Sequence, residues 1–268
     1  MVRLVNMQKS QWWGILNVPE NNSYMLNSAT FILAVEHKAK EWCIHVKRNS
    51  ESNVEENDKD YKHFVGEFSP VYCGDISRHI VNGNTNALQI KRSLADRTVV
   101  CRPKSPITIV PGASVVIYLS TPIWLTIGLA GNKDTLLKEV ATQRLSDTWF
   151  GASTREGELC YASQTVGRLD IDKLPFRRQR AITPLLIENQ ADNDLIFERI
   201  ALPVPSLSLF STKSGQLWTQ NVSLIREDDG DFAKLKLGRP QPDSTFINGP
   251  RVELGHGQLI RAFSEIFS

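Results

Sequence analysis

The sequence has few cysteines, few aromatic residues and no long hydrophobic run near its N-terminus. Aromatic residues make up 8% of its 268 residues. The first twenty-two residues contain no apolar stretch of the length that an export signal needs, so we expect a cytoplasmic protein. The cysteines form no C-x-x-C pair, which argues against a zinc or redox motif and favours reduced, buried thiols. They are Cys43, Cys73, Cys101 and Cys160.

An excess of charge of either sign is also absent. The chain has 31 Lys and Arg against 29 Asp and Glu, a net charge of +2. This balance gives no electrostatic reason to expect a nucleic-acid partner. The apolar content of 41% is too high for a chain that is disordered throughout.

One uncharged stretch, between Lys104 and Lys133, is long enough to be tested as a membrane span. Pro106, Pro111 and Pro122 interrupt it, so we expect no transmembrane segment. Its pieces are short and rich in β-branched residues, which is typical of strands buried on both faces.

Short runs of this kind recur along the chain and predict an all-β protein. We expect an antiparallel β-sandwich or two packed β units, with at most one or two short helices. The helical candidates are residues 79–94 and 258–267, and the second could equally be a terminal strand. The pair Asp229-Gly230 predicts a hairpin turn, because it supplies the positive φ angles that tight turns need.

The domain organisation has a candidate boundary near the middle of the chain. A break between Gly131 and Ser146 divides it into an N-terminal β unit, residues 1–131, and a C-terminal β unit, residues 146–268. A single continuous domain is the alternative. The polar stretch 49–60 is expected to be a surface loop.

Common catalytic and nucleotide-binding motifs are missing. The chain has no P-loop, no dinucleotide-binding G-x-G-x-x-G, no H-E-x-x-H and no G-x-S-x-G, so we expect no cofactor and favour a protein that is not an enzyme. Among the five histidines, only His37 and His45 could meet across a hairpin, and two imidazoles alone do not make a metal site.

Two groups of carboxylates are weak candidates for a metal or catalytic site. Asp170 and Asp172 would share one face if they lay on a strand, and would be exposed if they lay in a loop before Pro175. The group Asp228, Asp229 and Asp231 is explained by turn chemistry alone.

The most positive run contains Arg177, Arg178 and Arg180, next to Phe176. Guanidinium groups can hold a phosphate, a carboxylate or an acidic partner surface, but they also occur on solvated strand edges. Core packing explains most of the six tryptophans, and Trp149 is kept as a candidate binding residue.

The middle of the chain resembles a known family. Residues 145–159 read LSDTWFGASTREGEL before Cys160-Tyr161, and upstream lie Pro111-Gly112 and the segment YLSTPIW at 118–124. This order resembles the prokaryotic family called domain of unknown function 432, over the middle and C-terminal two-thirds of the chain. Residues 184–189 and 200–203 are similar to its later strands. The resemblance implies no activity and no catalytic residues. It implies an accessory role near the inner membrane, beside small-conductance mechanosensitive channels.

Two functions from different classes follow. The first is a non-enzymatic binding or accessory protein with a protein partner, in which the arginine run forms the contact surface. The alternative is a binding protein or enzyme for a carbohydrate or anionic small molecule, built around Asp170 and Asp172. A structural subunit of a larger assembly is a third hypothesis, and the sequence predicts no oligomeric state.

Overall fold

A computed structural model describes residues 11–49, 62–67, 74–82, 85–131, 135–153, 155–165, 167–255 and 257–264. In this part of the chain the only helices are two 3-10 turns, η1 (Ile171–Lys173) and η2 (Val204–Ser206), and all other regular elements are strands. The all-β prediction is therefore confirmed. None of the described helices is long and apolar enough to span a membrane. Most of the polar stretch 49–60, together with Cys73, lies outside the described residues.

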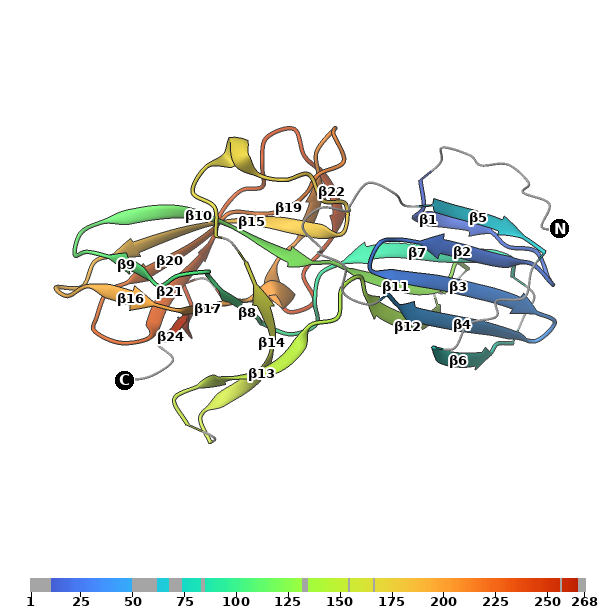
Figure 1. Cartoon of the computed structure of the whole chain (residues 1–268), viewed down its shortest axis with the longest axis horizontal. Helices are drawn as coiled ribbons and strands as arrows, with labels where there is room; N and C mark the ends of the chain where they lie inside the picture. The colour runs from blue at the N-terminus through green and yellow to red at the C-terminus, as the bar shows by residue number, and fades with distance from the viewer. Residues whose placement is uncertain are drawn as a thin grey trace. The chain divides into compact units, whose positions relative to one another are not determined.

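The chain forms two compact units, and neither is continuous in sequence (Figure 1). The first unit contains residues 1–92 and 124–143, and the second contains residues 93–123 and 144–268. The chain therefore passes between the units three times. The last passage lies inside the stretch 131–146 where the sequence places a boundary, whereas the first two have no counterpart in the sequence pattern.

The first unit contains a five-stranded and a four-stranded antiparallel sheet. The five-stranded sheet has the order β5 (Lys62–Gly66), β2 (Ser23–Asn27), β3 (Phe31–Lys38), β4 (Glu41–Arg48), β6 (Asp75–Ile80). The four-stranded sheet has the order β1 (Gly14–Asn17), β7 (Ala87–Ser93), β11 (Trp124–Leu129), β12 (Thr135–Ala141).

The alternation along β3 and β4 gives this sheet a core face. Three successive alternate side chains of each strand are apolar and buried on that face, while Ala34 and Cys43 are also buried on the other face. The buried apolar residues of β7 and β11 give the other sheet a matching face. The core residues of β3 and β4 are Phe31, Leu33, Val35, Trp42, Ile44 and Val46.

The second unit is built around β15 (Arg180–Asn189). This strand pairs with β10 (Ser114–Pro122) in antiparallel fashion over nine residue pairs. Its other edge is shared by two parallel neighbours, β19 (Leu217–Thr219) at its start and β20 (Val222–Arg226) at its end. The sheet continues through β18 (Leu209–Ser211), β21 (Phe232–Leu237), β22 (Thr245–Asn248) and β23 (Leu259–Arg261).

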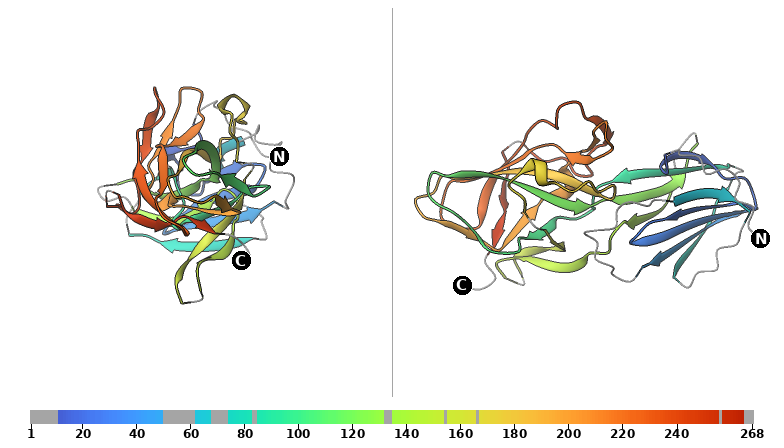
Figure 2. Two further views of the ribbon diagram at one scale, coloured as in Figure 1. Left: turned by 90° about the vertical axis from the view of Figure 1, so that its left-hand side faces the viewer. Right: turned by 45° about the horizontal axis from the view of Figure 1, so that its top comes forward.

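A five-stranded sheet completes this unit, with a two-stranded ribbon beside it. The sheet has the order β13 (Ser146–Gly151), β14 (Gly157–Gln164), β8 (Val99–Arg102), β17 (Arg199–Leu202), β24 (Phe263–Ser264). The ribbon pairs β9 (Ile107–Ile109) with β16 (Leu195–Phe197). The β13–β14 hairpin projects from the rest of its unit in both Figure 1 and Figure 2.

Three local predictions can be compared with these strands. The hairpin at residues 228–231 is confirmed: β20 and β21 pair around it, and Gly230 has a φ of 128°. The short helix considered for 79–94 is not present in the described part of that segment, where β6 ends at Ile80 and β7 contains Ala87–Ser93. Residues 259–264 follow the strand alternative, as β23 and β24.

Candidate functional site

The arginine run lies where the chain enters β15, and its three members have different surroundings. Arg178 is exposed, with its guanidinium 5.8 Å from the ring centroid of Phe176. Arg177 is half-buried, and its backbone N–H donates to Gln216 Oε1 at 3.2 Å. The run is therefore not a single row of free cations.

Arg180 is buried, with only 4% of its surface exposed. Its Nε donates to Ser120 Oγ at 3.0 Å, and its Nη2 donates to the carbonyl oxygen of Ser120 and, at 3.5 Å, to Ser163 Oγ. These bonds join β15 to β10 and β14, so the side chain supports the fold and cannot reach a partner surface.

The two candidate carboxylates lie in a loop and not on a strand. Asp170 precedes η1, and its Oδ1 accepts a hydrogen bond from the backbone N–H of Asp172 at 3.0 Å. Its other oxygen lies 3.1 Å from Lys173 Nζ. Asp170 therefore acts as a helix cap, and Asp172 is exposed beside it.

Trp149 lies on β13, in the projecting hairpin, and is 43% exposed. Its Nε1 donates to the carbonyl oxygen of Ser153 at 2.8 Å. Arg199 Nη2 donates to the carbonyl oxygen of Trp149, also at 2.8 Å. Trp149 and Arg180 lie in different sheets, since β13 belongs to the sheet that contains β14 and β8, and Arg180 is the first residue of β15.

His37 and His45 do not meet, because they lie on opposite faces of the β3–β4 pair. His37 is on the core face, where its ring stacks on Trp42 with the centroids 4.0 Å apart. His45 is on the other face, with Nε2 3.7 Å from Glu36 Oε2. The hairpin forms as predicted, but the strand alternation separates the two imidazoles.

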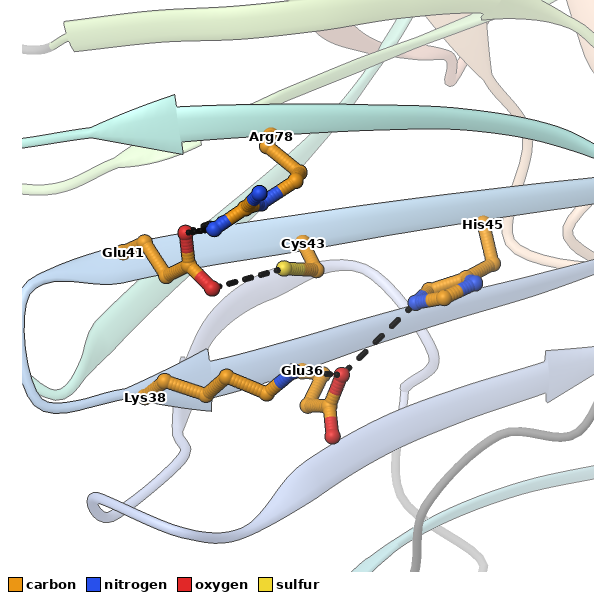
Figure 3. Close-up of polar contacts among 6 residues, drawn as sticks. All are labelled: Glu36, Lys38, Glu41, Cys43, His45 and Arg78. Carbon is orange, nitrogen blue, oxygen red and sulfur yellow. Dashed lines mark hydrogen bonds and ion pairs between the residues drawn. The ribbon is translucent and has the colours of Figure 1, made fainter.

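That second face carries a network of charges, shown in Figure 3. Lys38 Nζ lies 3.1 Å from Glu36 Oε2, on the oxygen that also faces His45. Arg78, on the neighbouring strand β6, donates from Nε and Nη2 to Glu41 Oε2 at 3.0 and 2.6 Å. This contact holds the pKa of Glu41 below its ordinary value.

The network has the chemistry of an ion cluster and not that of a catalytic site. Cys43 Sγ donates to Glu41 Oε1 at 3.6 Å, and burial raises the pKa of this thiol, so it is not activated as a nucleophile. Across the described residues, no group of three or more His, Cys, Asp or Glu side chains is placed to hold a metal ion.

The second unit contains a groove of about 650 Å³ beside the turn end of the β13–β14 hairpin. Its walls come from the hairpin, from the chain before β8, from the segment after β17, and from β21, β23 and the loop that precedes β23. Apolar side chains form much of its surface, and several are unusually exposed for their type. Leu159 is 50% exposed, Val252 54% and Phe232 44%.

Two arginines line this groove, and each is already paired with a carboxylate. Arg97 Nη1 lies 3.2 Å from Asp147 Oδ1, and its guanidinium packs over the ring of Tyr161. Arg261 Nη1 lies 2.6 Å from Asp231 Oδ2, and its guanidinium lies 4.7 Å from the ring centroid of Phe232.

Two glutamates on the hairpin side of the groove have no such partner. Glu156 and Glu158 are exposed, and neither carboxylate forms an ion pair with a described Lys, Arg or His side chain; the polar neighbour of Glu158 is the thiol of Cys160. The groove therefore combines an apolar surface with two carboxylates on one wall that no described cationic side chain neutralises.

Comparison with known families decides the relationship of the chain. The model of the family described as "Protein of unknown function (DUF432)" matches residues 12–265. The chain belongs to the DUF432 family. No curated protein and no solved structure matches the chain.

The DUF432 match begins far upstream of the segment that carries the sequence resemblance, and it includes both units. The groove is the feature that sequence reasoning missed. Its lining comes from segments as distant as Asp96 and Arg261, and no local pattern connects them. The sequence offers one indication at this site: Glu158, a charged residue, lies two positions before Cys160 and so shares a face of β14 with a residue type that is usually buried.

Proposed function

We propose that this DUF432 protein acts by binding a partner protein and not by catalysis, with the groove of the second unit as the contact site. The observation that carries the proposal is the exposure of large apolar side chains in a concave site. Monomeric proteins seldom leave contiguous apolar surface open to water unless it binds something. Leu159, Phe232 and Val252 provide such a surface.

The alternative of an enzyme with a carboxylate site has less support. Asp170 caps η1 and pairs with Lys173, and both roles are structural. The buried thiols Cys101 and Cys160 have their pKa values raised to about 12 by burial, so they are poor nucleophiles.

For the identity of the partner we propose a small-conductance mechanosensitive channel, and for the location the cytoplasmic side of the inner membrane, where such a channel would hold the protein. This part of the proposal rests on the family resemblance alone. An accessory protein of this kind needs no membrane span of its own, since the partner supplies the attachment.

The experiment is capture of the partner from the native host, with tagged protein and gently solubilised membranes. We expect Phe232→Asp and Leu159→Asp to lower partner recovery at least about tenfold, because each change replaces an apolar side chain of the contact by a short, strongly hydrated one. The control is Phe246→Asp, which places the same charge on an exposed aromatic of β22, outside the groove. Equal recovery with all three variants would exclude the groove as the contact site.

The arginine run is tested separately through Arg178, its exposed member. Arg178→Glu reverses a solvated charge, whereas reversal of Arg180 would leave a buried carboxylate and test folding instead. Loss of partner recovery with Arg178→Glu and not with Phe232→Asp would move the contact site to the start of β15.

A further inference from the structure

We infer that the groove takes an extended segment that presents a lysine or arginine between apolar side chains. The inference rests on the proposed function and names the chemistry of the partner at that site. It starts from the charges, because the apolar surface alone does not select one occupant.

Negative charge predominates at the groove. Asp96, Glu156 and Glu158 line it against Arg97 and Arg261. Both arginines are neutralised by aspartates next to the lining, Asp147 and Asp231. Asp96 accepts a hydrogen bond from the Tyr161 hydroxyl at 3.0 Å and also lies 3.9 Å from Arg97 Nε, so its charge is already paired and the unneutralised charge of the lining is that of Glu156 and Glu158.

The arginines are also held in place by aromatic rings, which makes them poor ligands for an anion. The guanidinium of Arg97 lies 5.0 Å from the Tyr161 ring centroid, and that of Arg261 lies 4.7 Å from the Phe232 centroid. An anionic ligand would have to displace both the aspartate and the ring contact. Glu156 and Glu158, in contrast, form no ion pair with a described residue, so a cationic ligand has no Lys or Arg to displace; the Cys160 thiol beside Glu158 is a weak donor.

The two glutamates lie two residues apart at the start of β14, on either side of Gly157. Glu158 pairs in register with Phe150, which is buried at the base of the groove. A cation held by these carboxylates is therefore adjacent to the apolar surface. This arrangement fits a chain segment in which apolar and basic side chains are close neighbours.

The experiment uses three labelled five-residue peptides that alternate leucine with lysine, glutamine or glutamate, and follows fluorescence anisotropy at low salt. We expect the lysine peptide to bind at least about tenfold more tightly than the glutamine peptide, with the glutamate peptide weakest. The Glu156→Gln/Glu158→Gln variant should bind the lysine and glutamine peptides equally.

The matched control is Asp192→Asn/Asp194→Asn. These carboxylates are also exposed, also two residues apart and in the same unit, but outside the groove lining. This control should keep the full preference for lysine. Raising the salt concentration should weaken only the lysine peptide, because screening reduces attraction between exposed charges.

The outcomes separate this inference from the proposed function. Equal binding of the three peptides would overturn the proposal that the groove takes a basic segment. So would a preference for lysine that survives in the Glu156→Gln/Glu158→Gln variant. Partner recovery that still falls with Phe232→Asp would in that case leave the groove as the contact site, with apolar contacts alone.

Discussion

Burial keeps Cys101 and Cys160 protonated in the folded protein. Both are fully buried, and desolvation is the largest cause that raises the pKa of each thiol to about 12, from an ordinary value of 9.0. Cys160 belongs to a small core cluster with Val100, Phe150 and Ala201, which packs the hairpin against β8 and β17. These thiols behave as small apolar side chains, as their sequence neighbours predict.

The raised pKa values predict a loss of stability at high pH. Below pH 9 the thiols are protonated in both states, so their contribution is fully present. As the pH rises from 9 towards 12, the unfolded chain ionises first, and the free energy of unfolding falls. Urea unfolding at pH 8 and pH 10 should show this fall. The variant Cys101→Ala should show a smaller fall, and an identical fall would contradict the assignment.

At the scale of elements, the β13–β14 hairpin depends on two glycines that face each other. A Cβ on Gly151 would lie 1.9 Å from the carbonyl oxygen of Glu156. A Cβ on Gly157 would lie 2.6 Å from the carbonyl oxygen of Phe150 and 2.7 Å from Trp149 Nε1. The indole covers Gly157 and explains why Trp149 remains at the surface. Its neighbour on β13, Phe150, points to the other face of the strand and is buried.

This close approach predicts the effect of a single methyl group. Gly157→Ala should lower the free energy of unfolding by about 1 to 3 kcal/mol, since the strand backbones must move apart. The control is Gly255→Ala in the same unit, where a Cβ meets nothing within 4 Å and φ is not positive. Chemical denaturation of both variants measures the difference, and equal stabilities would show that the hairpin can absorb the extra atom.

The face on which a side chain lies could be predicted where a single strand contains the whole alternation of apolar and polar residues. The alternation that buries Phe31, Leu33 and Val35 continues to His37, and the pattern of Trp42 and Ile44 places His45 on the other face. Counting along both strands would have separated the two histidines without a structure. Arg180 could not be assigned in this way, because its burial depends on Ser120 and Ser163, sixty and seventeen residues away.

At the scale of the whole molecule, successive segments of the chain belong alternately to the first and the second unit. β8 lies inside its sheet between β14 and β17, and β10 pairs along nearly the whole of β15. Both strands come from residues 93–123, which lie between the two pieces of the first unit. The all-β class follows from composition and short runs, but this exchange does not, because it depends on pairings between distant strands.

The alternation predicts which fragments fold. Residues 1–131 lack β12, and residues 146–268 lack β8 and β10, so both fragments should aggregate or remain unfolded. A chain that joins residue 92 to residue 124 through a short flexible linker and ends at residue 143 should fold as the first unit alone. Near-UV circular dichroism and thermal unfolding measure this. Cooperative unfolding of residues 146–268 alone would contradict it.

The place of β10 in the chain has a consequence for synthesis on the ribosome. β10 ends at Pro122, whereas its partner β15 begins at Arg180, after the last strand of the first unit has been made. At a translation rate of about 5 to 20 residues per second, the apolar strand β10 waits roughly 3 to 12 seconds for its partner. The first unit can close during this interval, so the order of synthesis leaves β10 as the edge most in need of protection from other nascent chains.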